Sequence, residues 1–350
     1  MTPHAPTRFQ LADGYSFARL INGCWQLAAG HSGHRPGNEE LLGGLEELAR
    51  AGFTTFDCAD IYSGVEELLG ELRRRLSPEG VDIEIHTKFV PDRGALRGIS
   101  RRYVREIVHR SLQRLGVDRL DLVQYHWWDW EVPGWIDVAL WLDELRRQGD
   151  IGRLGMTNTD VVHLAEILEA GVPIVTNQVQ YSLLDRRPDN GLAAFCREQG
   201  VELLCYGALA GGFLSARWLG SPEPTAPLAN RSLVKYRLIV DELGGWRELQ
   251  TLLATLGAIA ERHEVSLANV AARWVLDRPA VGAIIVGAGG AAHLEENLRL
   301  FDLELDDEDQ RALGRLLAER PGPPGDVYSL ERDWSGPHAA ILRTELNRPT

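Results

Sequence analysis

The feature that most constrains the fold is an alternation of short β-rich runs with longer amphipathic helical patterns almost to the end of the chain. The period, about thirty residues, is that of a strand–helix unit. Such an alternation predicts a parallel sheet with helices packed against it. The predicted strands comprise residues 17–25, 54–59, 83–88, 121–126, 153–158, 174–180, 202–207 and 282–287.

Eight strands with intervening helices favour an α/β fold of the closed (β/α)8 type, the TIM barrel. An open doubly wound sheet is the alternative, but no GxGxxG turn follows the first strand. We expect residues 1–320 to form a single barrel domain, because such barrels commonly exceed about 200 residues. The predicted helices cover residues 39–52, 65–76, 100–116, 135–149 and 160–171, and four of them end in a glycine of the kind that stops helices: Gly52, Gly116, Gly149 and Gly171.

Two irregular regions interrupt the pattern. A long insert, residues 211–246, follows the seventh predicted strand, and a C-terminal extension, residues 321–350, begins at PGPPG, which must break the preceding helix. Long irregular segments in compact domains are usually functional or disordered. We expect the extension to fold over the barrel or to reach a neighbouring subunit. The acidic stretch 305–310 is expected to open a helix.

Composition narrows the functional classes. The 350 residues are 44% hydrophobic and 25% charged, as in ordinary globular proteins, and no apolar run predicts a membrane span. The start lacks the apolar core of a secretory signal, and a net charge of -13 argues against general nucleic-acid affinity. We therefore expect a cytoplasmic protein without membrane or nucleic-acid partners. Its scattered cysteines are read as reduced, buried thiols: Cys24, Cys58, Cys196 and Cys205.

Polar residues stand at consecutive predicted strand ends, where the active site of a (β/α)8 barrel forms. Singly, each has an ordinary explanation: Asp57 could cap a helix, Lys88 could be a rim lysine, and His126 could be a satisfied core histidine. Jointly they are hard to explain by packing, because a buried polar group without a partner costs free energy. The set is Asp57, Lys88, His126, Asn158, Gln178 and Tyr206.

Four residues suit the transfer of a proton to a carbonyl oxygen: Asp57, Tyr62, Lys88 and His126. A phenol titrates near pH 10 when unperturbed, so it acts as an acid at neutral pH only beside a cation. A carboxylate would hold that cation in place. If the strand ends are neighbours around one barrel, the four side chains converge.

Motifs in a fixed order then point to a family. They are FDCADIYSGVEELLGELR, HTKF, LVQYHWW, GMTN, NQVQYSLLDRR, CYGALAGGFL and VGAGGAAHLEENL. With these segments, spread over residues 17–305, the chain resembles the aldo-keto reductase family. The resemblance implies that Tyr62 is the general acid, that Lys88 lowers its pKa, and that Asp57 holds Lys88. It also implies that His126 orients the carbonyl group.

The resemblance further implies a nicotinamide cofactor, NADP(H) rather than NAD(H). Thr157, Asn158 and Gln178 match the residues that bind the carboxamide, and Tyr206 matches the aromatic residue under the ring. Trp25, Trp127 and Trp128 match walls of the substrate pocket. The other implied cofactor contacts are Gly23, Cys24, Asp57, Gly207, Leu209, Gly211, Lys235, Gly287, Gly289, His293, Glu296 and Asn297.

The segment that usually binds the 2′-phosphate of NADPH in the family departs here from the family pattern. It reads GAGGAAH at 287–293, with glycines where donors are expected. Arg231, Lys235 and Arg237 of the insert could supply the charge instead, or form an ordinary solvated loop. Trp128 and Trp130 could likewise line the substrate pocket or pack against the next helix.

The predicted function is the NAD(P)H-dependent reduction of a small aldehyde or ketone to an alcohol, or the reverse. The alternative is a cofactor-binding regulatory or redox-sensing subunit with the same fold and little turnover. A metal-assisted hydrolase is disfavoured, because the sequence has no HxH or HExxH cluster, and we expect no metal. The tail and the aromatic patch leave self-association to a homo-oligomer open.

Overall fold

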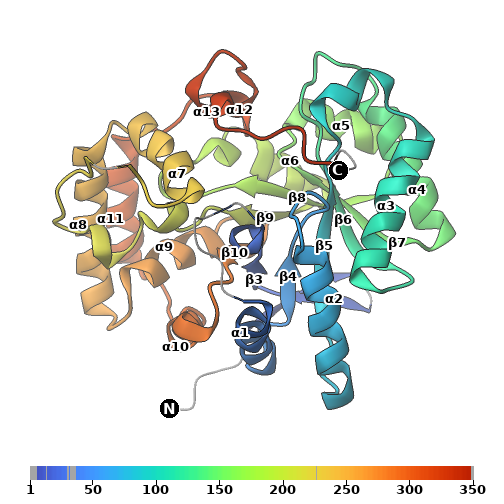
Figure 1. Ribbon diagram of the computed structural model, residues 1–350. Helices are drawn as coiled ribbons and strands as arrows, with labels where there is room; N and C mark the ends of the chain where they lie inside the picture. Colours follow the sequence, from blue (N-terminus) through green and yellow to red (C-terminus); the bar gives the residue numbers. More distant parts are fainter. Residues whose placement is uncertain (1–5, 13, 30, 32–36, 226, 348–350) are drawn as a thin grey trace.

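The computed structural model describes residues 6–12, 14–29, 31, 37–225 and 227–347. Eight parallel strands form a closed barrel in the order β10-β3-β4-β5-β6-β7-β8-β9, and helices surround it (Figure 1). This confirms the predicted (β/α)8 architecture. The barrel strands are β3 (Leu20–Gly23), β4 (Thr55–Asp57), β5 (Glu84–Phe89), β6 (Leu120–Tyr125), β7 (Ile151–Thr157), β8 (Ile174–Gln180), β9 (Glu202–Tyr206) and β10 (Val281–Gly287).

The first half of the helical layer follows the sequence pattern closely. Apolar residues at helical spacing face the barrel, and the predicted stops are real, since Gly116 and Gly149 end their helices in the left-handed conformation. The helices are α1 (Asn38–Arg50), α2 (Val65–Leu76), α3 (Arg101–Leu115), α4 (Trp135–Gln148), α5 (Val161–Glu169) and α6 (Leu192–Gln199).

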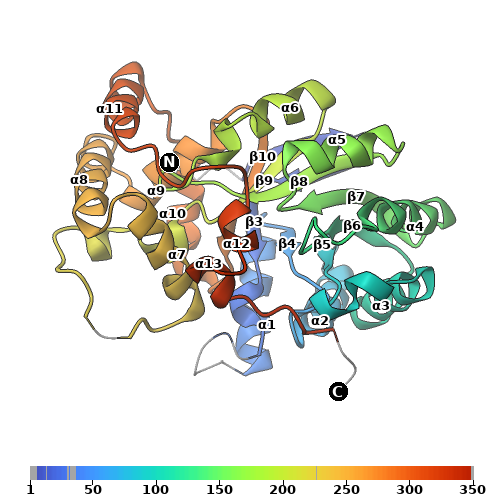
Figure 2. The same ribbon diagram turned by 90° about the horizontal axis from the view of Figure 1, so that it is seen from above.

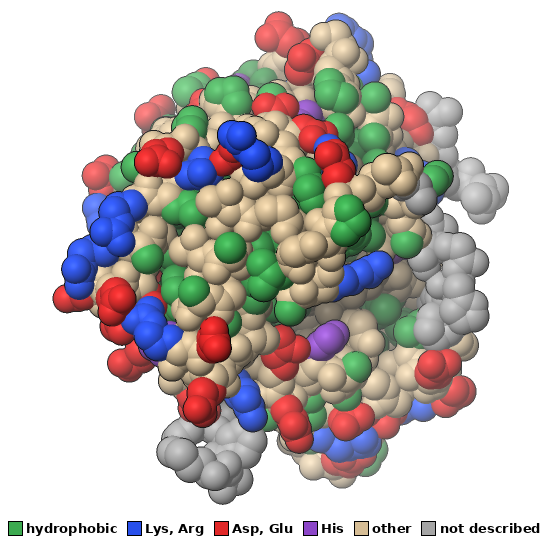
Figure 3. All heavy atoms as spheres, turned by 90° about the vertical axis from the view of Figure 1, so that its left-hand side faces the viewer, with side chains coloured by type: hydrophobic (Ala, Val, Ile, Leu, Met, Phe, Trp, Pro, Cys, Tyr) green, Lys and Arg blue, Asp and Glu red, His purple; other side chains and the backbone are tan. Residues whose placement is uncertain are grey.

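The second half is more elaborate. After β9, the seventh barrel strand, the insert runs through short turns into α7 and the start of α8. Asp306 caps α11 with its side chain, as expected for an acidic stretch that opens a helix. The remaining helices are α7 (Arg231–Glu242), α8 (Trp246–Arg262), α9 (Leu267–Leu276), α10 (Leu294–Arg299), α11 (Asp307–Ala318), α12 (Ser329–Arg332) and α13 (Pro337–Ala340). Acidic and basic side chains alternate over the face that carries α7, α8 and α11 (Figure 3).

One predicted strand is divided in the structure. Residues 17–25 were expected to be continuous, but the chain breaks at Arg19, whose guanidinium donates to the carbonyls of Leu276, Val281 and Gly282. The part before the break pairs with the N-terminus as a hairpin, β1 (Arg8–Ala12) and β2 (Tyr15–Ala18). The hairpin precedes β3, so it covers the amino-terminal end of the barrel.

The C-terminal extension lies over the opposite end. Viewed from above, it crosses the mouth of the barrel from α11, through α12 and α13, towards α3 (Figure 2). Its far end is held by Asn347, which donates to the carboxylates of Asp60 and Asp92. Among the described residues, no helix is both long and apolar enough to cross a bilayer.

Candidate active site

Four predicted catalytic residues meet at the carboxyl ends of β4, β5 and β6. Asp57 ends β4, Lys88 lies in β5, and His126 follows β6. Lys88 Nζ donates to Asp57 Oδ2 at 2.6 Å and to the carbonyl of Cys58 at 2.9 Å. The same Nζ lies 5.3 Å from the centroid of the Tyr62 ring. The barrel closure therefore brings a carboxylate, a cation and a phenol into one row.

A turn between β4 and α2 carries Tyr62 to this position. The amide of Tyr62 donates to the carbonyl of Ala59, and the amide of Val65 donates to the carbonyl of Tyr62. Gly64 adopts φ +77° directly before α2, a conformation that side-chain-bearing residues rarely adopt. The motif spacing between Asp57 and Tyr62 is thus the length of one tight strand-to-helix connection.

A buried amide network fixes Asp57. Gln178 Nε2 donates to Asp57 Oδ1 at 2.6 Å, and Gln124 Nε2 donates to the same oxygen at 3.0 Å. Gln178 also donates to Gln124 Oε1 at 2.8 Å. Sequence reasoning did not single out Gln124; its place in the strand two residues before His126 was the available signal. With both carboxylate oxygens engaged, Asp57 can only hold Lys88, not act as a free base.

The charge of Lys88 agrees with the sequence-based expectation, whereas the pKa of Tyr62 does not. Burial alone would lower the pKa of Lys88, but Asp57 holds it above its usual value, so the lysine stays charged. Burial raises the pKa of Tyr62 to about 12, although Lys88 acts to lower it. The expected effect of Lys88 is present, but desolvation of the phenolate outweighs it. Tyr62 is therefore a protonated donor throughout the neutral range.

His126 is buried with one nitrogen free. Its Nδ1 faces the carbonyl of Thr157 at 3.3 Å; since a carbonyl only accepts, Nδ1 carries the proton. Nε2 has no partner among the described residues. Burial, with the nearby charge of Arg332, lowers the pKa of His126 to about 3, so the ring is neutral. In this tautomer Nε2 accepts, which suits the hydroxyl of an alcohol or of Tyr62.

The residues predicted for the nicotinamide lie beside this row. The Tyr206 hydroxyl donates to Asn158 Oδ1 at 2.8 Å, and the side-chain Nδ2 of Asn158 forms no hydrogen bond within the described chain. Thr157 Oγ1 donates to the carbonyl of Gln178 at 3.0 Å. Lys235 Nζ lies 4.6 Å above the Tyr206 ring. One free amide donor and one aromatic ring thus adjoin Gln178.

The loop after β9 is shaped by two glycines against α7. A Cβ atom would lie 2.4 Å from the Tyr236 hydroxyl at Gly207 and 2.6 Å from the Tyr236 ring at Gly211. Only glycine allows this approach. Leu209 N-caps the short turn between them. Within the loop, the amide of Ala210 donates to the carbonyl of Gly207 and the amide of Gly212 to that of Leu209.

The predicted adenosine-end residues follow β10 as a separate group. Gly287 pairs with Gly23 in the β10–β3 register, and the amide of Cys24 donates to the carbonyl of Asp57. Backbone hydrogen bonding therefore connects Gly287, Gly23 and Cys24 to Asp57 of the row. His293 contacts Glu296 at 3.1 Å on the exposed side. Gly289 lies between β10 and α10 with open space at its Cα, and Asn297 is partly exposed within α10.

Two of the three basic residues of the insert have partners away from the candidate cofactor residues. Arg237 pairs with Glu223 and Asp241, and Arg231 donates to the carbonyl of Ile341 in the tail. Lys235, as noted, lies over Tyr206.

The three predicted substrate-pocket tryptophans have different surroundings. Trp128 contacts the edge of His126, with ring centroids 4.3 Å apart. Trp127 is fully buried, and its Nε1 donates to the carbonyls of Asp129 and Val132. Trp25 is partly exposed and contacts His31. Trp128 is therefore the one in direct contact with the catalytic row.

The tail supplies site residues that sequence reasoning missed. Tyr328 contacts the edge of His126 at a centroid distance of 5.4 Å. Glu331 accepts from Arg187 at 3.0 Å, and Arg187 also pairs with Asp185 at 2.7 Å; all three are buried. Arg332 donates to the carbonyls of Trp127 and Asn158. The only signal in the sequence was that residues 325–338 are too varied for a linker.

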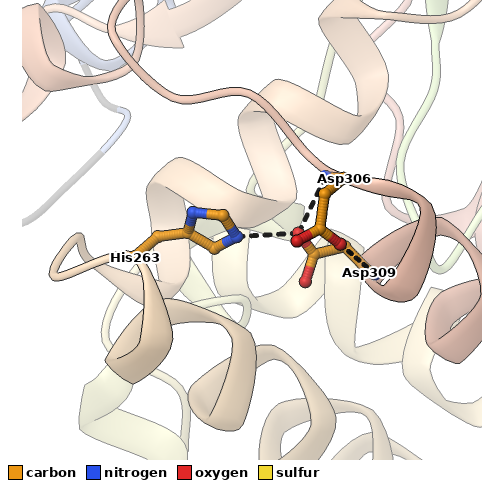
Figure 4. Close-up of side chains that lie close together, drawn as sticks. All are labelled: His263, Asp306 and Asp309. Carbon is orange, nitrogen blue, oxygen red and sulfur yellow. Dashed lines mark hydrogen bonds and ion pairs between the residues drawn. The ribbon is translucent and has the colours of Figure 1, made fainter.

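A second cluster has metal-ligand character but lies away from the barrel mouth, at the start of α11 (Figure 4). His263 Nε2 contacts Asp309 Oδ2 at 2.7 Å, and Asp306 and Asp309 form the cap of the helix. Arg262 pairs with the same carboxylates. The acidic oxygens are thus engaged in capping and ion pairing, and the cluster is structural.

Comparisons with known proteins agree with this geometry. The model of the aldo/keto reductase family matches residues 19–318. The chain is 26% identical to the NADH-specific methylglyoxal reductase of Escherichia coli (strain K12), over 87% of this chain and 95% of that protein. It is 30% identical to aldo-keto reductase str7 of Strobilurus tenacellus, over 83% and 84% of the two chains.

Solved structures give the same picture. The crystal structure of the thermostable aldo-keto reductase Tm1743 is 27% identical, with a TM-score of 0.70 over 89% of this chain and 100% of that one. The glycerol dehydrogenase AKR11B4 from Gluconobacter oxydans shares the fold, with a TM-score of 0.75 at 22% identity, over 93% and 98% of the two chains. The chain therefore belongs to the aldo/keto reductase family of oxidoreductases, which act on carbonyl compounds and alcohols with nicotinamide cofactors.

Proposed function

We propose that the protein interconverts an aldehyde or ketone and the corresponding alcohol, with Tyr62 as general acid and base. The observation that carries the proposal is the row in which Asp57 holds Lys88 at 2.6 Å while Lys88 Nζ lies 5.3 Å from the Tyr62 ring. A fixed ammonium group beside a phenol stabilises the phenolate that forms when the proton leaves.

Each residue of the row has a distinct task in this proposal. Tyr62 donates its proton to the carbonyl oxygen as the oxygen becomes an alkoxide. Lys88 stabilises the resulting phenolate, and Asp57 keeps the ammonium group in place. Once the alcohol has formed, its hydroxyl can donate to the free Nε2 of His126, and the same contact would position an alcohol substrate in the reverse reaction. Asp57, Lys88 and His126 are buried, so their charges and hydrogen bonds act in a medium of lower dielectric constant than water.

The residues beside the row fit a nicotinamide. The unpartnered side-chain Nδ2 of Asn158 could donate to the carboxamide, and the Tyr206 ring offers a face for stacking. When bound, a reduced nicotinamide supplies the hydride. Lys235 lies over the Tyr206 ring, so we propose that it moves aside and contacts the cofactor phosphates. The loop from Gly207 to Gly211 supports the same phosphate position.

The choice between the two dinucleotides remains a prediction. The expected preference for NADP(H) needs a cation near the 2′-phosphate, yet Arg237 is neutralised by Glu223 and Asp241. A relative in Escherichia coli is named NADH-specific. Comparing dissociation constants for NADPH and NADH tests the preference. Equal values would mean that the 2′-phosphate is not recognised.

The decisive experiment replaces Tyr62 with Phe. We expect kcat for carbonyl reduction, followed by the absorbance of the reduced nicotinamide, to fall by about 10²- to 10⁴-fold. Cofactor affinity, followed by quenching of tryptophan fluorescence, should change little. The matched control is Tyr103→Phe, because that hydroxyl accepts only from the Asp92 amide outside the site.

Two outcomes would count against the proposal. Full activity of Tyr62→Phe would remove the assigned acid. Tight cofactor binding without turnover of any aldehyde or ketone would favour the alternative, a regulatory or redox-sensing subunit.

We also propose that the barrel and the tail act as one functional unit and that the protein is cytoplasmic. Support for the cytoplasmic location comes from the four cysteines, which are all buried and unpaired, as in reducing compartments. Self-association remains a prediction, which the mass in solution would test.

A further inference from the structure

Arg332 is held at the mouth of the barrel by two backbone carbonyls. Its Nη1 donates to the carbonyl of Asn158 at 2.9 Å and its Nη2 to that of Trp127 at 2.8 Å. Trp127 directly follows His126, and Asn158 directly follows Thr157, the residue that holds His126. The guanidinium therefore sits over the ends of β6 and β7, beside the proposed catalytic histidine.

Arg332 has no ion-pair partner in the described part of the chain, although the charges of Asp160 and Glu331 act to raise its pKa. Its Nε has no acceptor. The preceding residue behaves differently, since Glu331 pairs with Arg187 at 3.0 Å. Burial lowers the pKa of Arg332 only to about 10, so it remains a cation at neutral pH. A buried, unpaired guanidinium is costly unless something compensates it.

Aromatic rings frame this cation. Its Cζ lies 4.7 Å from the Trp130 ring and 5.1 Å from the Tyr328 ring. Tyr328 and Trp128 both contact the edge of His126. The guanidinium, the rings of Trp130 and Tyr328, and His126 therefore form one contiguous group at the mouth of the barrel.

We propose that Arg332 recognises a carboxylate on the substrate, so that the preferred substrates are carbonyl compounds that also carry a carboxylate group. A guanidinium matches a planar carboxylate through two parallel hydrogen bonds, and Arg332 retains its Nε–H and further Nη hydrogens for this purpose. The inference rests on the proposed carbonyl chemistry, because it places the reacting carbon between Tyr62 and His126.

Arg332 also latches the tail, so the experiment must separate charge recognition from tail docking. The probes are 4-carboxybenzaldehyde and its neutral isostere 4-formylbenzamide, assayed with the same cofactor. The variants are Arg332→Gln, which removes the charge, and Arg332→Lys, which keeps it. The control is Arg93→Gln, because Arg93 stacks on the tail residue Trp334 at 3.6 Å but pairs with Asp129.

We expect the wild-type protein to prefer the carboxylate over the amide by about 10- to 100-fold in kcat/KM, the range of a charge-assisted hydrogen-bonded pair. Arg332→Gln should abolish this ratio, mainly through KM for the carboxylate. Arg332→Lys should restore part of it, and Arg93→Gln should leave the ratio as it is. A wild-type ratio near one, or an equal loss for both aldehydes in Arg332→Gln, would overturn the proposal.

A binding measurement keeps this inference distinct from the proposed activity. Benzoate and benzamide are titrated into the complex with reduced cofactor, and tryptophan fluorescence is followed. Benzoate binding that is tighter than benzamide binding and depends on Arg332 would support the carboxylate site even if no aldehyde were turned over, which would refute only the proposed function. Benzoate affinity unchanged in Arg332→Gln would refute the carboxylate site.

Discussion

The barrel is covered at both ends, but the two covers differ in chemistry. At the amino-terminal end, the β1–β2 hairpin contributes rings: Phe17 stacks on Phe9 and contacts the edge of His86, and the Tyr15 hydroxyl bonds His86 Nε2 at 2.9 Å. At the mouth, the tail contributes charges, with Glu331 and Arg332 at its centre. One cover extends the apolar core, and the other lies over the proposed site.

This difference leads us to expect that the hairpin serves stability and that the tail serves substrate binding. Apolar burial gains free energy wherever it occurs, so the hairpin needs no further partner. The tail leaves Arg332 without an ion-pair partner and His126 Nε2 without a donor. A buried polar group without a partner needs an explanation, and at the mouth a bound ligand supplies one. We therefore expect changes in the hairpin to alter unfolding, and changes in the tail to alter substrate binding.

The largest effect should come from Phe17→Ala. Phe17 is fully buried, so its truncation should reduce the free energy of unfolding by about 3–5 kcal/mol. Urea unfolding measures this change, and kcat/KM of the folded fraction should stay within about twofold of wild type. A fall in kcat/KM as large as that of a site variant would contradict the expectation that the hairpin affects stability but not substrate binding.

Next comes Glu331→Gln, which keeps the shape of the tail but removes one charge beside Arg187. We expect tail docking to weaken by about 1.5–3 kcal/mol, seen as faster limited proteolysis and a higher KM for carbonyl substrates. The midpoint of urea unfolding should move less than in Phe17→Ala. Glu319→Gln is the control, since Glu319 is exposed and pairs with Arg320 just after the end of α11; it should match wild type.

The pH dependence of the reduction and oxidation rates tests the proposed role of Tyr62 at the mouth. With the pKa of Tyr62 raised to about 12, the phenol stays protonated, so kcat for reduction should be flat between about pH 6 and 9. Alcohol oxidation needs the phenolate, whose fraction rises about tenfold per pH unit below the pKa. Initial rates in both directions test this. A reduction rate that falls above neutral pH would assign Tyr62 a lower pKa.

The smallest effect should come from Arg8→Gln in the hairpin. Arg8 pairs with Glu84 at 2.6 Å, but its side chain is 36% exposed. Such pairs contribute about 0–1 kcal/mol, so the melting temperature should fall by only a few degrees. A loss of stability comparable to that of Phe17→Ala would mean that ion pairs also contribute strongly to the stability of the amino-terminal end of the barrel.

Local patterns were sufficient to predict the barrel and the position of the candidate site. Six consecutive strands, β4 to β9, each carry an apolar run and a polar residue at or near the end, so Asp57, Lys88 and His126 could be located from neighbouring residues alone. The direction of the pKa of Tyr62 could not, because it depends on burial by distant segments. The division of the first strand at Arg19 also depends on remote carbonyls, those of Leu276, Val281 and Gly282.

The tail could not be predicted, because its contacts span most of the chain. Arg332 reaches the carbonyl of Trp127 across 205 positions in sequence, and no spacing rule links the two. Short helices such as α12 have no amphipathic period to detect. Sequence alone therefore identified the tail as an unusual segment but not Tyr328, Glu331 or Arg332 as parts of the mouth.

The buried thiols have a consequence for a protein that handles electrophiles. Aldehydes add readily to thiolates, and thiolates form where a cysteine is exposed and its pKa is low. Here all four cysteines are 0% exposed, and burial raises the pKa of Cys196 to about 12. Cys58 adjoins the proposed chemistry, since its carbonyl accepts from Lys88, and burial raises the pKa of its thiol as well. A substrate passing the mouth therefore meets no reactive sulfur, and the folded protein should withstand concentrations of aldehyde that would add to the cysteines of its unfolded chain.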